Sequence, residues 1–148
     1  MSELRVPSRV APSPIGAPPA LLADPVAAPA DAARHFAALL EYETDCWDVH
    51  DALVRGATGF VVLDVRGPES YALGHVPGAL NLPHAKIHER TLAALPKNAL
   101  VVVYCSGPHC NGADRAAWRV ARHGYRVKKM IGGVSGWTHE GYALETSD

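Results

Sequence analysis

The chain has 148 residues, of which 48% are hydrophobic and 20% are charged, and this length and composition suit one globular domain with a tail. Its 14 basic and 15 acidic residues give a formal net charge of −1 without a long charge run, which argues against nucleic acid or a membrane surface as a partner. The three cysteines are too few for a disulfide framework, and no stretch approaches the roughly 18 apolar residues of a membrane span. These features predict a cytoplasmic protein.

Proline dominates the first part of the chain. Most prolines fall in residues 1–30, in alanine-rich runs such as 11–14 and 17–20. Because proline lacks an N–H group and fixes φ, such a segment is not expected to build a ladder or a core. Prolines also crowd the short apolar run at 20–23, which argues against a signal peptide. We predict a disordered Pro/Ala-rich arm over residues 1–30.

Helical patterns occupy residues 31–57, which we predict to be an N-terminal helical extension. Asp31 is a suitable N-cap for a first helix with apolar positions three and four residues apart. Asp45 is a suitable N-cap for a second helix that ends near Arg55, with Gly56 as the stop signal. The apolar positions of the first helix are Ala33, Phe36, Ala37 and Leu40.

Strand and helix patterns alternate over residues 58–148. Such alternation is typical of an α/β domain whose mainly parallel sheet is covered on both faces. Ligands in these folds gather beyond the carboxyl ends of the strands, which is where Asp64 and Cys105 fall. The expected strands are 60–65, 79–82, 100–104 and 126–131, and the expected helical stretches are parts of 84–95 and a helix from about 113.

Cys105 follows a β-branched strand pattern and precedes an alanine-rich helical pattern, so its thiol should lie in a loop at a helix N-terminus. Backbone N–H groups at the start of a helix carry partial positive charge. They favour a thiolate and any anion delivered to it. We therefore expect sulfur chemistry at Cys105.

Four ordered motifs within residues 58–142 resemble the rhodanese family. The resemblance implies a three-layer α/β domain with a central, mainly parallel sheet of about five strands, to which the N-terminal helices are added. It also implies that Cys105 is the catalytic residue and carries sulfane sulfur as a persulfide. The motifs are VLDVR at 62–66, ESYALGHVPGALNLP at 69–83, VVYC at 102–105 and GGVSGW at 132–137.

The loop after Cys105 departs from the family pattern, because it is longer and holds no arginine before Gly112. Enlarged loops occur in the related dual-specificity phosphatases and arsenate reductases, in which an arginine six positions after the cysteine grips the oxyanion. Asn111 occupies that position here. A phosphoryl group would lose its charge-assisted clamp, which argues against phosphatase activity.

The predicted function is sulfur transfer. The Cys105 thiolate would attack the outer sulfur of thiosulfate or a related small anionic donor, and the persulfide would pass its sulfur to a thiol, cyanide or protein acceptor. No cofactor is expected, because the covalent persulfide on Cys105 is the intermediate that carries the sulfur. No metal is expected, because His84 and His88 belong to no closed zinc-site spacing. The predicted anion-binding loop is Ser106, Gly107, Pro108, His109, Cys110, Asn111 and Gly112.

Residues around the loop are expected to support the site. Asp64 is expected to be a structural hydrogen-bond acceptor, and Arg66 is expected to pair with a nearby carboxylate. His75 lies in a turn that hydrogen bonds should anchor. Arg115 either supplies the positive charge that the loop lacks or extends into water. For His109, attraction of anions and simple exposure both remain open.

The two other cysteines invite several interpretations. Cys110 is a resolving thiol, a second sulfur relay or a wedge that shapes the loop. Cys46, like Trp137 in the last motif, is expected to be a packing residue. An alternative function uses Cys105 and Cys110 together, in a noncatalytic sulfur carrier or a thiol redox and interaction module.

Overall fold

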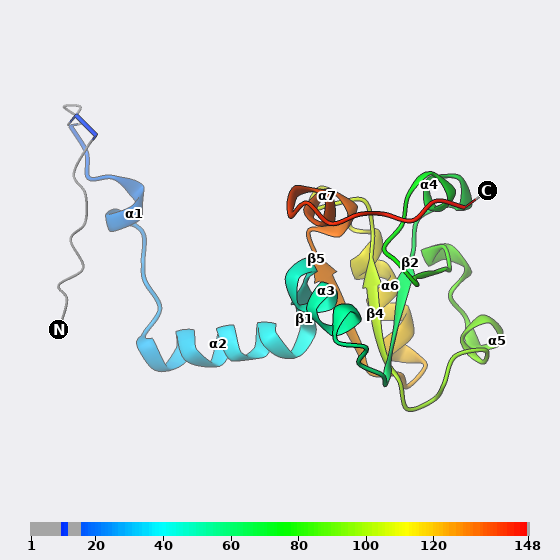
Figure 1. The fold of residues 1–148 in the computed structure, drawn as a ribbon. Helices are drawn as coiled ribbons and strands as arrows, with labels where there is room; N and C mark the ends of the chain where they lie inside the picture. The colour runs from blue at the N-terminus through cyan, green and yellow to red at the C-terminus, as the bar shows by residue number, and fades with distance from the viewer. Residues whose placement is uncertain (1–9, 12–15, 148) are drawn as a thin grey trace. The chain divides into compact units, whose positions relative to one another are not determined.

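Five strands form a sheet at the centre of residues 35–148 (Figure 1). They are β1 (Glu43–Asp45), β2 (Phe60–Asp64), β3 (Leu80–Asn81), β4 (Leu100–Tyr104) and β5 (Val127–Ile131). Their order is β1-β5-β4-β2-β3, and all paired neighbours are parallel. β2 and β4 pair along their whole length, so Asp64 and Tyr104 end these strands side by side. The predicted α/β fold with a mainly parallel sheet is confirmed.

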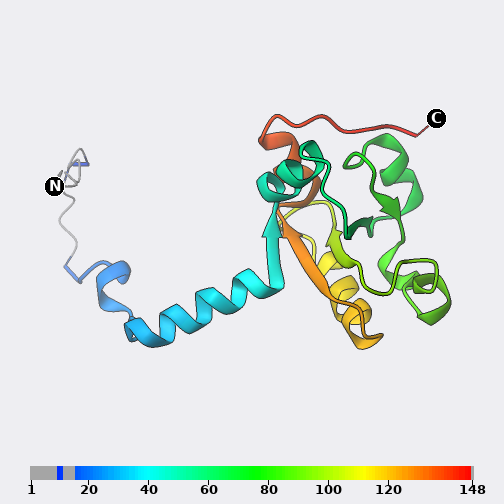
Figure 2. The ribbon, with the colours of Figure 1, turned by 60° about the horizontal axis from the view of Figure 1, so that its bottom comes forward.

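Successive side chains of a strand point to opposite faces of the sheet, so the apolar central strands present an apolar surface on both faces. Helices cover both surfaces, and the domain therefore has three layers. α6 (Gly112–Arg122) packs against the face that carries Val103. α3 (Cys46–Val54) and α7 (Gly133–His139) lie side by side on the face that carries Val102 (Figure 2). Each face of the central strands therefore has its own core.

The structure, a computed structural model, describes residues 10–11 and 16–147. The chain divides into two units, residues 1–34 and 35–148. None of the helices in the described part is both long and apolar enough to cross a bilayer.

The predicted disordered arm is helical in two places. α1 (Ala20–Ala23) forms one turn after Pro19, and α2 (Pro29–Tyr42) begins on a proline. The prediction of disorder up to residue 30 is wrong at these positions, because proline at the start of a helix removes an N–H group that has no intrahelical partner. Residues 1–9 and 12–15 lie outside the described residues.

The second predicted helix is confirmed as α3. Asp45 caps it, since its carboxylate accepts a hydrogen bond from the Asp48 amide at 2.8 Å. The three residues of β1 were not predicted as a strand, although they pair in parallel with β5 and set Glu43 beside Lys129. A three-residue strand is too short to show the alternation that identifies a strand. The helical extension predicted over 31–57 therefore contains one strand of the sheet.

Short helical segments connect β2 to β4. They are α4 (Pro68–Leu73), η1 (His84–Lys86) and α5 (Glu89–Leu92), of which the last two confirm the partly helical stretch expected at 84–95. α4 was not predicted, because one and a half turns carry too little apolar periodicity. Cys46 and Trp137 are both buried in one core cluster, as packing residues would be.

Candidate active site

Cys105 is the first residue after β4, at the carboxyl edge of the sheet. Its side chain belongs to the core beneath α6, and the residue is only 6% exposed. The loop of residues 106–111, called the active-site loop below, connects Cys105 to α6. Because the thiol itself is nearly covered, its surroundings depend on how this loop is held.

The start of α7 holds the active-site loop. The Val134 amide donates a hydrogen bond to the Cys105 carbonyl at 3.1 Å, and the Ser135 amide donates to the Ser106 carbonyl at 2.9 Å. Gly133 has a φ of +55°, and a Cβ atom there would lie 2.3 Å from the Cys105 carbonyl oxygen. Only glycine fits this approach, and it fixes the loop backbone beside the thiol.

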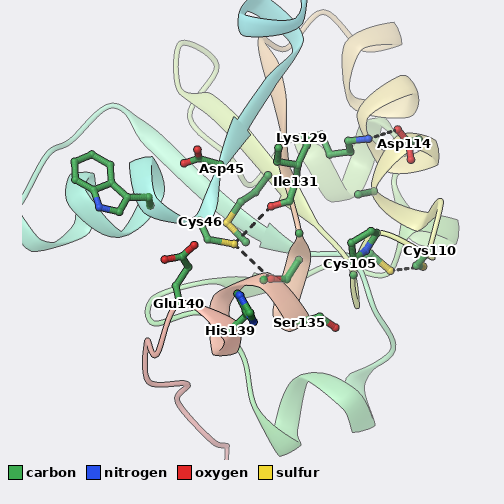
Figure 3. A pocket seen from close by; sticks show the side chains of 18 residues that line it. Asp45, Cys46, Cys105, Cys110, Asp114, Lys129, Ile131, Ser135, His139 and Glu140 are labelled. Atoms are coloured by element: carbon green, nitrogen blue, oxygen red, sulfur yellow. Dashed lines mark hydrogen bonds and ion pairs between the residues drawn. The ribbon is translucent and has the colours of Figure 1, made fainter. Parts of the chain in front are cut away.

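The active-site loop brings a second thiol against the first. Sγ of Cys110 lies 2.6 Å from Sγ of Cys105 (Figure 3). The Cys110 amide closes a turn by donating to the Gly107 carbonyl at 3.1 Å, and the Gly112 amide donates to Sγ of Cys110 at 3.4 Å. A Cβ atom at Gly112 would lie 2.9 Å from Sγ of Cys105. The two sulfurs therefore occupy space that a side chain at Gly112 would take.

The pKa values of the two thiols are shifted in opposite directions. Burial, and then the hydrogen bond with Cys110, raise the pKa of Cys105 above its ordinary value. The hydrogen bond with Cys105 and the Gly112 amide lower the pKa of Cys110. At Cys105, burial outweighs the Ser106 backbone hydrogen bond that favours a thiolate, whereas the Gly112 amide bonds to the outer, half-buried sulfur of Cys110.

Two cavities meet at the thiol pair. One of about 720 Å³ is bounded by the N-terminus of α3, by β5, by α7 and by the active-site loop. Another, of about 340 Å³, lies between η1, residues 65–67 and the start of α6. Cys105 and Cys110 line both cavities. The thiol pair therefore borders two separate spaces.

The two cavities differ in charge. The larger is lined by three carboxylates, one histidine and Lys129, whose Nζ lies 2.8 Å from a carboxylate oxygen of Asp114. The smaller is lined by Arg66 and His84, and no carboxylate stands among the residues described there. A small anion is therefore better accommodated in the smaller cavity.

A buried carboxylate holds Arg66 at the smaller cavity. Nε and Nη2 of Arg66 donate to the two Asp64 oxygens at 3.0 and 2.6 Å, and the Tyr104 hydroxyl donates to Asp64 at 2.8 Å. Burial opposes the charge on Arg66, but the bonds with Asp64 outweigh it and raise the pKa of the guanidinium. The structure thus places Asp64 as a structural acceptor and Arg66 as its partner.

Four predicted residues line neither cavity: Asp64, described above, and His75, His109 and Arg115. Nδ1 of His75 lies 2.8 Å from the Tyr71 carbonyl oxygen, and its ring stacks on the Tyr71 ring at 3.8 Å between centroids. Arg115 is exposed, with Nε 3.4 Å from the Asn111 side-chain oxygen. His109 is also exposed. The cavities instead bring together the rest of the loop, Ser106, Gly107, Pro108, Cys110, Asn111 and Gly112, with Cys105 and Arg66.

The sequence interpretation missed two site residues. His84 lines the smaller cavity, and Nη1 of Arg119 donates to its carbonyl at 2.5 Å and lies 3.2 Å from its Nδ1. Ser135 lines the larger cavity and donates through Oγ to the Ser106 carbonyl at 3.1 Å. Both follow strands of the sheet, β3 and β5, so the rule about carboxyl ends of parallel strands could have found them.

His84 and His88 do not form a helical metal pair. η1 ends at Lys86, and His88 is the N-cap of the separate helix α5. Within residues 10–11 and 16–147, no three histidine, cysteine or acidic side chains converge as a metal site would require.

Known proteins are similar to this chain in sequence and in fold. Residues 48–140 match the family model described as the rhodanese-like domain. The thiosulfate sulfurtransferase PspE of Escherichia coli is 38% identical over 73 residues, which cover 49% of this chain and 68% of that protein. The HTH-type transcriptional regulator Rv0324 of Mycobacterium tuberculosis is 37% identical over 118 residues, covering 78% of this chain and 51% of the regulator. The chain thus spans about half the length of that relative.

Solved structures give the same result. The BH2092 protein of Bacillus halodurans superposes with a TM-score of 0.78 at 41% identity, over 80% of this chain and 87% of that one. A thiosulfate sulfurtransferase of Pseudomonas aeruginosa superposes with a TM-score of 0.60 at 25% identity, over 80% of this chain and 22% of that one.

Proposed function

Since the chain belongs to the rhodanese-like domain family, we propose that it is a sulfurtransferase in which Cys105 carries sulfane sulfur as a persulfide. The observation that carries the proposal is the position of Cys105. Its sulfur stands at the carboxyl edge of the central strand, borders both cavities, and is followed by a loop whose backbone α7 holds in place. A cysteine that only packed the core would need none of these features.

The proposed reaction has two steps. The Cys105 thiolate attacks the outer sulfur of thiosulfate, the S–S bond of thiosulfate breaks, and sulfite leaves with the bonding electrons. A nucleophilic acceptor such as cyanide then attacks the outer sulfur of the persulfide, forms thiocyanate and regenerates the Cys105 thiolate. Each step exchanges one bond to sulfur for another, so no external oxidant or reductant is consumed.

The smaller cavity is the proposed entrance for the anion. Arg66, whose charge the buried Asp64 balances, lines this cavity, and Arg119, which bonds to His84, supplies a positive charge beside it. Asn111, the N-cap of α6, makes no side-chain cap bond to the first turn of this helix, whose amides would then serve the anion. Well-placed donors of this kind contribute about 3 kcal/mol each to stabilising charge in a transition state.

Mass spectrometry of trypsin digests tests this proposal. No lysine or arginine lies between Lys97 and Arg115, so trypsin releases Cys105 and Cys110 in one peptide, 98–115, and Cys46 in another, 35–55. After incubation with thiosulfate, the Cys110→Ser protein should gain one sulfur atom in peptide 98–115. A sulfur atom gained by peptide 35–55 instead, or by neither peptide, would contradict the proposal.

Gly112→Ala should slow persulfide formation by roughly 10- to 100-fold, because a displaced reacting atom costs that much in rate. The new Cβ would lie 2.9 Å from Sγ of Cys105, so this sulfur must move, and it would touch Sγ of Cys110 at 3.4 Å. The rate of thiocyanate formation measures the effect. Gly16→Ala is the matched control, since a Cβ there meets nothing within 4 Å. Equal rates of thiocyanate formation by the two variants would show that the position of Sγ of Cys105 beside Gly112 does not set the rate of the reaction.

The rate of persulfide formation should rise with pH through the neutral range. The raised pKa of Cys105 means that this thiol is protonated at low pH and becomes the nucleophilic thiolate only as the pH increases. In Cys110→Ser the hydrogen bond and charge that raise this pKa are gone, so the rise should shift to lower pH. Single-turnover rates against pH measure the shift. An unmoved or oppositely moved profile would show that Cys110 does not set the acidity of Cys105.

A further inference from the structure

We propose that Cys110 is a resolving thiol, which attacks the Cys105 persulfide, releases its outer sulfur as hydrosulfide and leaves a Cys105–Cys110 disulfide. This inference rests on the proposed function, because it needs sulfur loaded on Cys105. It adds a second way to unload the site, one that requires no acceptor for the sulfur atom itself. The site would then convert sulfane sulfur to sulfide.

The distance between the two sulfurs favours attack by Cys110 on the inner sulfur of the persulfide, which is Sγ of Cys105. Sγ of Cys110 already lies 2.6 Å from Sγ of Cys105, whereas the length of a disulfide bond is about 2.05 Å. Only a small rotation brings the two into bonding distance. Attack on the outer sulfur would instead require Cys110 to move away from the position that the turn to Gly107 gives it.

The environment of each sulfur fits its role. Cys110 is half-buried and accepts a hydrogen bond from the Gly112 amide at 3.4 Å, which favours its thiolate. Cys105 is 6% exposed and sits in the core beneath α6. The thiol that must attack is therefore the more ionised one, and the sulfur that must be attacked is the buried one.

The third cysteine takes no part. Sγ of Cys46 lies 3.5 Å from the Ile131 carbonyl oxygen and 3.6 Å from the Gly133 carbonyl oxygen, positions that suit its S–H group as a donor. Burial, followed by the charges of Asp45 and Glu140, raises the pKa of Cys46 to about 11, so it stays a thiol at neutral pH. Cys46 therefore provides a matched control for the removal of one cysteine.

The atoms and electrons of the step balance. The Cys110 thiolate forms a bond to Sγ of Cys105, the bond between the two persulfide sulfurs breaks, and its electrons leave with the outer sulfur as hydrosulfide. The sulfane sulfur is reduced, and the two thiols are oxidised to the disulfide. A dithiol reductant, either a small molecule or a protein with two thiols, then reduces the disulfide by thiol–disulfide exchange and is itself oxidised.

The test uses the full chain, reduced, freed of reductant and loaded with a small excess of thiosulfate. We expect the wild-type protein to release sulfide, and its peptide 98–115 to lose the mass of two hydrogen atoms relative to the reduced peptide. Cys110→Ser should keep the added sulfur and release sulfide at a rate lower by about tenfold or more, because the attack is no longer intramolecular. Cys46→Ser should behave like the wild type.

The outcomes separate this inference from the proposed function. If Cys110→Ser gains a sulfur but the wild type forms no disulfide and keeps the sulfur, the sulfurtransferase proposal survives and the resolving role of Cys110 is overturned. Equal sulfide release by the wild type and Cys110→Ser overturns it too. If Cys110→Ser gains no sulfur at all, both proposals fail. Dithiothreitol added after the first turnover, and removed before fresh thiosulfate, should reduce the wild-type disulfide and allow a second release of sulfide, which supports the complete cycle; a disulfide that it leaves intact overturns the cycle.

Discussion

Replacing Cys105 with serine is expected to lower the rate of thiocyanate formation from thiosulfate and cyanide by about a thousandfold or more, since losing the nucleophile removes the covalent intermediate. A serine hydroxyl stays protonated at neutral pH and makes no persulfide. Serine is chosen because Cys105 lies inside the core and serine is similar in size to cysteine. The assay is thiocyanate production at saturating cyanide.

Two controls make this result interpretable. Thermal unfolding followed by circular dichroism establishes that the Cys105→Ser protein is folded. Cys46→Ser removes the other buried thiol, which is hydrogen bonded to backbone carbonyls, and should keep most of the activity. Thiocyanate formation by Cys105→Ser at the wild-type rate would assign the chemistry to another group and leave a purely structural role for Cys105.

Asp64→Ala is expected to destabilise the protein by about 3–5 kcal/mol, the usual cost of removing one partner of a buried ion pair. Asp64 is fully buried and accepts hydrogen bonds from Arg66 and from the Tyr104 hydroxyl. Without it, the guanidinium of Arg66 stays at 11% exposure with no carboxylate, and the Tyr104 hydroxyl loses its acceptor. Urea unfolding followed by fluorescence measures the change.

Asp51→Ala is the matched control for this loss of stability. Its pair with Arg55 is 3.3 Å long, but the two side chains are 38% and 75% exposed, so water already screens the charges. The change in unfolding free energy at such a pair is below about 1 kcal/mol. If Asp64→Ala is no more destabilising than Asp51→Ala, the buried network does not hold the carboxyl edge of the sheet together.

The fold was predictable because its signals are local. The β-branched runs that became β2 and β4 are apolar up to the last residue of each strand, as strands covered on both faces are, and the Asp45 cap marks the start of α3. β1 escaped prediction because its three residues become a strand only by pairing with β5. The turn after Pro19 escaped prediction, and α2 begins at Pro29 rather than at the predicted cap Asp31, because proline was taken to prevent a helix rather than to start one.

The site was predictable only in part. The place of Cys105 follows from the strand before it and the helix after it, and both are visible in the sequence. The acidity of its thiol depends on burial and on Cys110, five residues away, whose sulfur returns to it only through the turn closed at Gly107. His84 and Ser135 follow other strands and line the cavities beside the thiols, and such neighbours come from the topology of the sheet rather than from residue spacing.

The hydrogen bonds from α7 to the main chain of Cys105 and Ser106 hold the active-site loop in place without using the loop's own side chains. These bonds involve backbone groups, apart from one serine hydroxyl, and α6 anchors the opposite end of the segment. Side chains between the anchors, such as Pro108, His109 and Asn111, can therefore be exchanged without rebuilding the sheet. Libraries confined to Pro108 and Asn111, which line the two cavities, are expected to change which sulfur compounds the proposed sulfurtransferase accepts while leaving Cys105 in place.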